Sequence, residues 1–99
     1  MELKLGDKSY QLRYGIRALI LFEKMADKSF SLQGTTDWTI FVYAMLLAGS
    51  PDCGVELDDF IDEVAMSDLN AAISWATKQM EVENQLAEAA GDDNVKKKR

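Results

Sequence analysis

The stretch over residues 38–48 most constrains the fold, because nearly every position in it is apolar. Thr36 or Asp37 precedes it and can cap a helix, since a short side-chain oxygen satisfies an unpaired amide of the first turn. Gly49 and Pro51 follow as a stop signal. A strand is the alternative, but eleven residues is long for one, and the end signals favour a helix. We therefore predict a helix that is covered on all its faces.

Two short alternating segments at the N-terminus predict a β-hairpin over about residues 2–14. Leu3 and Leu5 alternate with charged residues, and tyrosine or leucine occupies every second position over residues 10–14. The glycine-containing segment 6–8 supplies the turn between them. An isolated hairpin is marginally stable in water, so this one must pack against the helices that follow.

Apolar residues spaced three and four apart predict three further helices. The first covers residues 16–26 or 16–27, and a loop over residues 29–35 leads to the apolar helix. A short helix covers residues 57–64, with acidic residues between its apolar positions. The last helix begins with Ser67 as its cap, weakens in pattern after residue 80 and ends at Gly91.

The length of the chain allows one hydrophobic core, because splitting 99 residues would leave two pieces too small to bury one each. The expected fold is mainly α: a single helical domain over residues 1–91, with the short N-terminal hairpin followed by about four helices. Residues 92–99 end in four consecutive basic side chains and are expected to form a disordered basic tail.

The absence of histidine and the presence of one cysteine restrict the chemistry of the chain. A hydrolytic triad with histidine is excluded, and one chain cannot assemble a tetrahedral zinc site of nitrogen and sulfur ligands. Cys53 has no disulfide partner in the chain, which suits a reducing compartment, and it is expected to be a small apolar filler. The acids of residues 52–63 lack the spacing of a calcium loop and indicate a solvated helix face. We expect no enzyme, and no catalytic, cofactor or metal site.

The charge and hydropathy of the chain argue against nucleic acids and membranes as partners. The net charge is −6, and residues 29–91 carry eleven acidic side chains against one basic one, which repels phosphate backbones. The basic residues 96–99 lack aromatic neighbours and are a weak signal for nucleic-acid binding. The longest apolar stretch, residues 40–48, is about half of what a membrane-spanning helix needs, and the N-terminus does not resemble a secretory signal. A cytoplasmic location is therefore expected.

Large apolar side chains are numerous for this length, and most of them must form the core. Tryptophan and methionine are also favoured where a surface adapts to apolar partners. In the last predicted helix the core pattern fades, so a partner-binding site is expected there. Its candidate residues are Trp75, Met80 and Leu86.

Several short segments within residues 1–65 carry a resemblance to a known protein family. They are residues 1–6 (MELKLG), 10–19 (YQLRYGIRAL), 22–24 (FEK), 29–30 (SF), 45–48 (MLLA) and 57–62 (LDDFID). Together they resemble the tail assembly chaperones of long-tailed bacteriophages and prophages. These segments are packing patterns, so the resemblance carries over no residue-level binding site.

The resemblance implies a small helical factor that binds the long tape-measure protein, and often the tail tube protein, during tail morphogenesis. Such a chaperone acts by non-covalent binding alone in the cytoplasm of the bacterial host and is absent from the mature virion. A homo-oligomer is compatible with this role. The alternative is a structural head-to-tail connector, or another small phage protein-interaction module, that stays in the particle.

Overall fold

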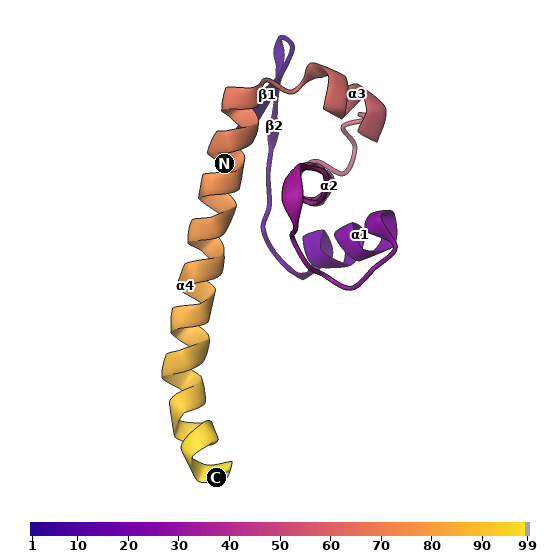
Figure 1. The fold of residues 1–99 in the computed structure, drawn as a ribbon. Helices are drawn as coiled ribbons and strands as arrows, with labels where there is room; N and C mark the ends of the chain where they lie inside the picture. The colour runs from indigo at the N-terminus through magenta and orange to yellow at the C-terminus, as the bar shows by residue number, and fades with distance from the viewer. Residues whose placement is uncertain (99) are drawn as a thin grey trace.

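Two strands and four helices make up the fold, which is shown as a computed structural model in Figure 1. The structure describes the backbone of residues 1–98 and the side chains of residues 1–82. The elements are β1 (Glu2–Leu5), β2 (Lys8–Gln11), α1 (Ile16–Ala26), α2 (Gly34–Gly49), α3 (Leu57–Glu63) and α4 (Met66–Lys98). The predicted hairpin followed by four helices is therefore confirmed.

The two strands pair antiparallel, with Leu3 opposite Tyr10 and Leu5 opposite Lys8. This register leaves a two-residue loop that begins at Gly6, whose φ of 63° suits a residue without a Cβ. Leu3 and Leu5 are both buried, as their alternation predicts. The second strand is shorter than the alternating pattern, since it ends at Gln11.

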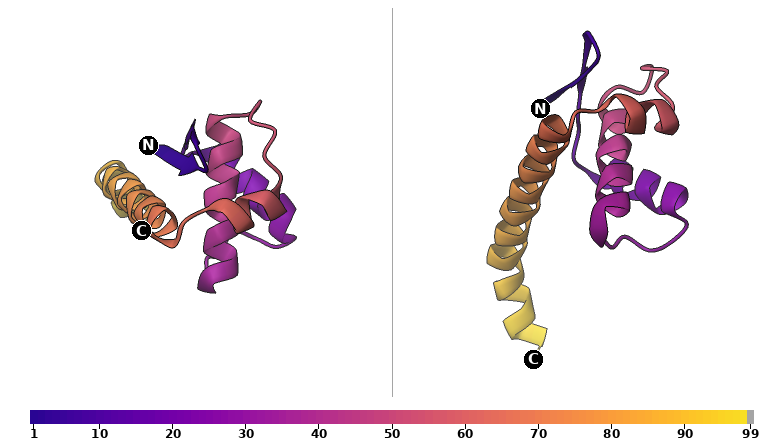
Figure 2. Two further views of the ribbon diagram at one scale, coloured as in Figure 1. Left: turned by 90° about the horizontal axis from the view of Figure 1, so that it is seen from above. Right: turned by 45° about the horizontal axis from the view of Figure 1, so that its top comes forward.

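The helix α2 lies in the middle of the molecule, with α1 on one side and the hairpin and α4 on the other (Figure 2). Its buried residues face every direction around the helix axis, as the apolar run predicts. The apolar ones are Phe41, Val42, Tyr43, Ala44, Met45, Leu46 and Ala48, and Asp37 is buried near the start of the helix. The helix ends at Gly49, which is the predicted stop.

The start of α2 differs from the sequence prediction. The helix begins at Gly34, so Asp37 lies inside its first turn and does not occupy the cap position. The Asp37 carboxylate instead accepts hydrogen bonds from the backbone N–H of Gln33 at 2.9 Å and from the Lys28 ammonium at 2.6 Å. These two bonds, one of them to the residue just before the helix, support a turn that lies upstream of the predicted start.

The last helix also differs at both ends. It begins at Met66, so Ser67 lies within the first turn and not at the cap. Its backbone continues past the predicted end at Gly91 to Lys98, so residues 92–98 are helical where a disordered tail was predicted, and Arg99 lies outside the described residues. A single glycine costs a helix only about 1 kcal/mol, and the residues just before Gly91 are good helix formers.

The Lys28–Asp37 pair predicts an acid-dependent loss of stability. The Lys28 hydrogen bond, followed by the Gln33 N–H, lowers the pKa of Asp37 below its ordinary value of 3.8, against the opposing effect of burial. A lowered folded-state pKa stabilises the fold above pH of about 4 and loses this contribution as the pH falls through it. Urea midpoints measured from neutral pH down to about pH 2 should therefore fall less steeply for Asp37→Asn than for the wild type.

A second variant, Lys28→Gln, removes the donor and leaves the carboxylate in place. It should weaken the same part of the pH dependence, because the ammonium is the largest cause of the lowered pKa of Asp37. An Asp37→Asn protein that keeps the full wild-type acid dependence would contradict this assignment.

Candidate binding surfaces

Neither a metal-binding cluster nor a membrane-spanning helix occurs among the described residues. Among the residues whose side chains are described, no three or more histidine, cysteine, aspartate or glutamate side chains gather in a geometry that could hold a metal ion. None of the described helices combines the length and hydropathy required to cross a bilayer. Cys53 is partly buried against the core, and its Sγ accepts a bond from the Val55 N–H at 3.4 Å.

Two of the three residues of the predicted partner site on α4 pack against the core, and the side chain of the third is not described. Met80 follows Ala76 by one turn on the stripe that packs against the core, and Trp75 is also partly buried there. Leu86 lies outside the residues whose side chains are described. Val82, two residues beyond Met80, is 51% exposed. The assignment of Trp75, Met80 and Leu86 to partner binding stays a prediction.

Most of the exposed large apolar side chains among residues 1–82 lie outside the predicted partner site. Besides Val82 there are four of them: Ile16 (71% exposed) and Ile20 (46%) on α1, Ile61 (49%) on α3 and Met66 (70%) at the start of α4. Two exposed isoleucines one turn apart on a short helix form a ridge that none of the other described side chains covers.

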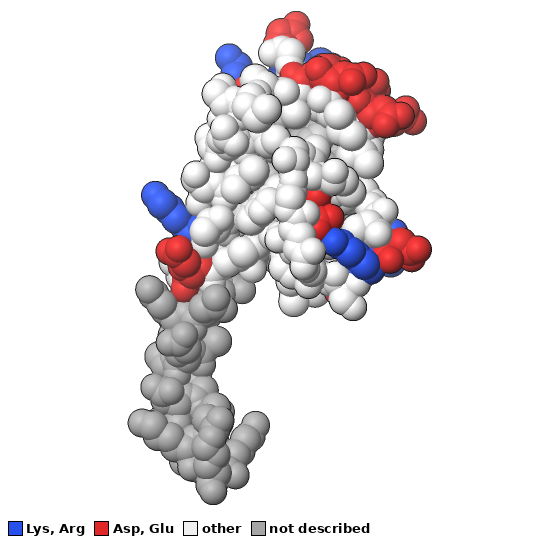
Figure 3. Space-filling view, viewed as in Figure 1, with Lys and Arg blue, Asp and Glu red and all other residues white. Residues whose placement is uncertain are grey.

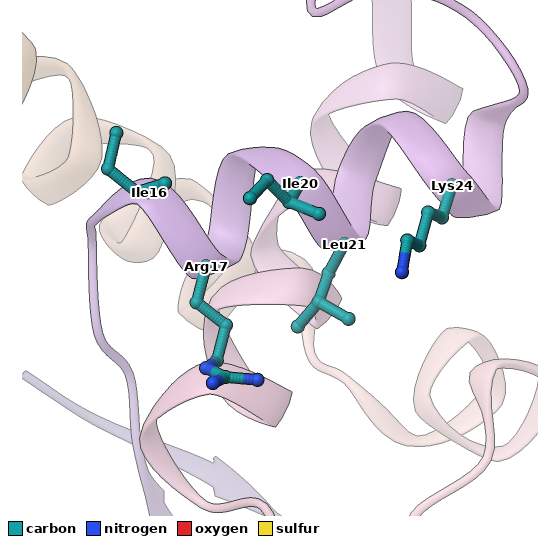
Figure 4. A pocket seen from close by; sticks show the side chains of 5 residues that line it. All are labelled: Ile16, Arg17, Ile20, Leu21 and Lys24. Carbon is teal, nitrogen blue, oxygen red and sulfur yellow. The ribbon is translucent and has the colours of Figure 1, made fainter.

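The surface of α1 joins these isoleucines to positive charge. A shallow hollow of about 320 Å³ is lined by Ile16, Arg17, Ile20, Leu21 and Lys24, which we call the α1 surface (Figure 4). Leu21 lies between Arg17 and Lys24 along the helix, and all three side chains project to one side (Figure 4). The arrangement is an apolar strip bordered by cations.

The α1 surface continues toward the end of α2. A neighbouring hollow is lined by Arg17 and Leu21 together with Arg13, Leu47 and Pro51. Glu23 is the nearby acidic residue on α1, and its carboxylate accepts a bond from the backbone N–H of Phe30 at 2.8 Å. The α1 surface is therefore apolar and basic.

The sequence contains the signal for this surface, although the prediction assigned these residues only to helical spacing. The core side of α1 is occupied by Ala18 and Phe22, which are fully buried and one turn apart. Ile16 and Ile20 form a second pair with the same spacing, displaced by about 200° around the helix. When a helix carries large apolar residues on two opposite sides and only one side packs against the core, the other side is exposed to solvent or to a partner.

A surface of opposite charge lies over α3. Acidic side chains gather at this end of the molecule in the space-filling view (Figure 3). Asp58 and Asp62 are exposed one turn apart, and Ile61 lies between them in the sequence. We call Asp58, Ile61 and Asp62 the α3 surface. The predicted solvated acidic face of this helix is thus confirmed, but it also contains an exposed isoleucine.

The side of α3 opposite this surface anchors it to the core. Phe60 is fully buried, and its ring lies 5.5 Å from that of Tyr43 on α2. The Tyr43 hydroxyl donates to the Val55 carbonyl at 2.6 Å, which fixes the segment leading into α3. Burial is the largest cause that raises the pKa of Tyr43 above its ordinary value, with smaller contributions from the neighbouring Cys53, Glu56 and Asp59.

The charges of the two surfaces have no ion-pair partner among the described side chains. Within residues 1–82, the one ion pair joins Lys28 to Asp37, which belong to neither surface.

The sequence of the chain was also compared with known proteins. Searches of protein-family models, of curated proteins and of solved structures found no match to this chain.

Proposed function

We propose that this chain is a phage tail assembly chaperone that binds apolar helical segments of a tape-measure protein by non-covalent contact. The observation that carries the proposal is the exposed pair Ile16 and Ile20 on α1, which the rest of the fold leaves uncovered. An amphipathic helix recognises such a surface by placing its apolar stripe against it. Binding in the host cytoplasm would shield that stripe until the tube assembles.

The size of the surface fits a transient chaperone better than a permanent subunit. Each isoleucine or leucine contributes about 1.5–3 kcal/mol when fully buried, and the α1 surface offers three of them, partly exposed. Stable complexes bury about 800 Å² on each partner, which one helix of eleven residues does not supply alone. Weak binding of one segment permits release when the next assembly partner arrives.

The charge of the surface selects among helical segments. Arg17 and Lys24 border the apolar strip, so the favoured segment carries acidic residues beside its apolar stripe. The rest of the body is acidic, which keeps the chaperone from binding acidic helices elsewhere. Specificity for one segment then follows from the position of the charges.

Replacing Ile20 with glutamate tests the proposal directly. The change places a charge in the middle of the apolar strip and should weaken binding to fragments of a tape-measure protein by at least about tenfold. The fold should survive, because Ile20 is 46% exposed. Calorimetric titration of overlapping helical fragments of the partner against both proteins would measure the change.

The matched control is Val82→Glu, since Val82 on α4 has a similar exposed fraction of 51%. Undiminished binding by this variant would place the contact on α1. Loss of binding with Val82→Glu and retention with Ile20→Glu would overturn the assignment to α1 and favour the last helix. Mass spectrometry of purified virions separates the chaperone from the structural connector, which would be present in the particle in stoichiometric amounts.

A further inference from the structure

We infer that the α1 surface of one copy of this chain docks on the α3 surface of a second copy. Of the five exposed large apolar side chains among residues 1–82, Ile16 and Ile20 lie in a basic setting. Ile61 lies in an acidic one. A body that exposes apolar side chains on two surfaces of opposite charge is complementary to itself. This inference does not require the tape-measure partner.

The two surfaces repeat one order of residues along a helix. On α1, Ile20 lies between Arg17 and Lys24. On α3, Ile61 lies between Asp58 and Asp62. On α1 the spacings of three and four place Ile20 on one side of the helix with Arg17 and Lys24. On α3 Asp58 is three residues from Ile61 and four from Asp62, so it neighbours both, while Ile61 and Asp62 are consecutive and lie about 100° apart around the axis.

The spacings of the charges are compatible with direct pairing. At a rise of about 1.5 Å per residue, Arg17 and Lys24 are about 10 Å apart along α1, and Asp58 and Asp62 are about 6 Å apart along α3. The long arginine and lysine side chains can close the difference by bending inward over the apolar strip. The isoleucines of the two helices then meet beside the two ion pairs.

The same contact is not made inside one chain. The helices α1 and α3 both pack against α2, and they lie beside different parts of it (Figure 2). The basic and acidic groups of the two surfaces remain without ion-pair partners among the described side chains. A second copy is therefore the occupant that satisfies both surfaces at once.

A contact between two different patches is heterologous, so its symmetry differs from that of a two-fold dimer. Each copy keeps one free surface after pairing, which leads to a ring if the rotation closes and to a chain of copies if it does not. Because the pairing includes exposed charges, added salt should weaken it.

Two double variants that each remove the charge of one surface test this inference. Arg17→Gln with Lys24→Gln removes the basic side, and Asp58→Asn with Asp62→Asn removes the acidic side. Analytical ultracentrifugation at low salt should show concentration-dependent association of the wild type. Each variant alone should raise the dissociation constant by at least about tenfold.

Mixing the two variants gives the decisive result. Each retains the surface that the other lacks, so an equimolar mixture should form a 1:1 dimer that grows no further. A twofold dimer interface built from one patch would not produce this complementation. A mixture that stays monomeric overturns the inference, as does a wild type that is monomeric up to its solubility limit.

The control variant, Lys4→Gln with Lys78→Gln, changes the net charge by the same amount at two exposed positions outside both surfaces. It should associate as the wild type does. If the basic double variant associates as strongly as the wild type, the occupant of the α3 surface is another basic segment, such as residues 96–99, and the inference is wrong. Failure here leaves the Ile20→Glu test of partner binding unaffected, so the two proposals fail separately.

Discussion

Replacing Phe41 with alanine is expected to lower the free energy of unfolding by about 3–5 kcal/mol, which approaches the whole stability of a domain this small. Phe41 has no exposed surface. Its ring contacts four others edge to face, at centroid distances of 5.1 Å to Phe30, 6.1 Å to Tyr14 and Phe22, and 6.3 Å to Trp38. Urea unfolding followed by circular dichroism would measure the loss.

The size of this effect follows from the place of Phe41 in the core. The four partner rings come from α1, α2 and the connecting segments on both sides of α1, so one side chain holds several parts of the chain together. Alanine would leave a cavity among aromatic rings, which are too rigid to collapse into it.

Ile16→Ala is the matched control for Phe41→Ala, because it also removes a large apolar side chain, but from a position that is 71% exposed. The expected change in the free energy of unfolding is within about 0.5 kcal/mol. A Phe41→Ala protein that loses less than about 1 kcal/mol would show that the aromatic cluster is not the centre of the core.

The fold could be predicted from the sequence wherever the pattern reflects burial. The alternation of Leu3 and Leu5 gave the hairpin, and the unbroken apolar run of α2 gave a helix covered on all sides. Helix ends were predicted well where glycine and proline mark them, as at Gly49. These features depend on neighbours in the sequence, so they can be read from it.

Features that depend on contacts between distant residues were not predicted. The start of α2 at Gly34 is tied to the bond from Lys28 to Asp37, and a bond across nine positions leaves no periodic signature. The exposure of Ile16 and Ile20 likewise depends on which side of α1 packs against α2. The sequence shows apolar residues around most of that helix, but it does not show which face is covered.

The proposed partner binding and the proposed self-association involve the same face of α1, and this has a regulatory consequence. A tape-measure segment that occupies the α1 surface would exclude the α3 surface of a second copy. The free protein would then shield its own apolar side chains by association, and binding of the partner would dissociate the assembly. Two ligands that compete for one surface are negatively coupled, and the coupling is the same in both directions.

Replacing Gly49 with alanine is expected to destabilise the fold by about 1–3 kcal/mol, although alanine is the better helix former. A Cβ at Gly49 would overlap the backbone carbonyl oxygen of Gln11 and would lie 3.0 Å from the backbone nitrogen of Arg13. The strand is held at this place by the Arg13 N–H, which donates to the Met45 carbonyl at 3.0 Å, and by the Ser50 hydroxyl, which bonds the Gln11 backbone.

The sign of the Gly49→Ala effect decides between two roles of the glycine. If Gly49 only ended the helix, alanine at this last helical residue would be neutral or stabilising by up to about 1 kcal/mol. Because the atoms that obstruct a Cβ belong to the backbone, they cannot move aside without breaking the bonds between the hairpin and α2.

Gly15→Ala is the control, since nothing lies within 4 Å of a Cβ there, and its thermal midpoint should stay close to that of the wild type. A Gly49→Ala protein that is as stable as Gly15→Ala would mean that the hairpin is not seated on the end of α2, and that the close backbone approach at this junction does not hold the two parts of the core together.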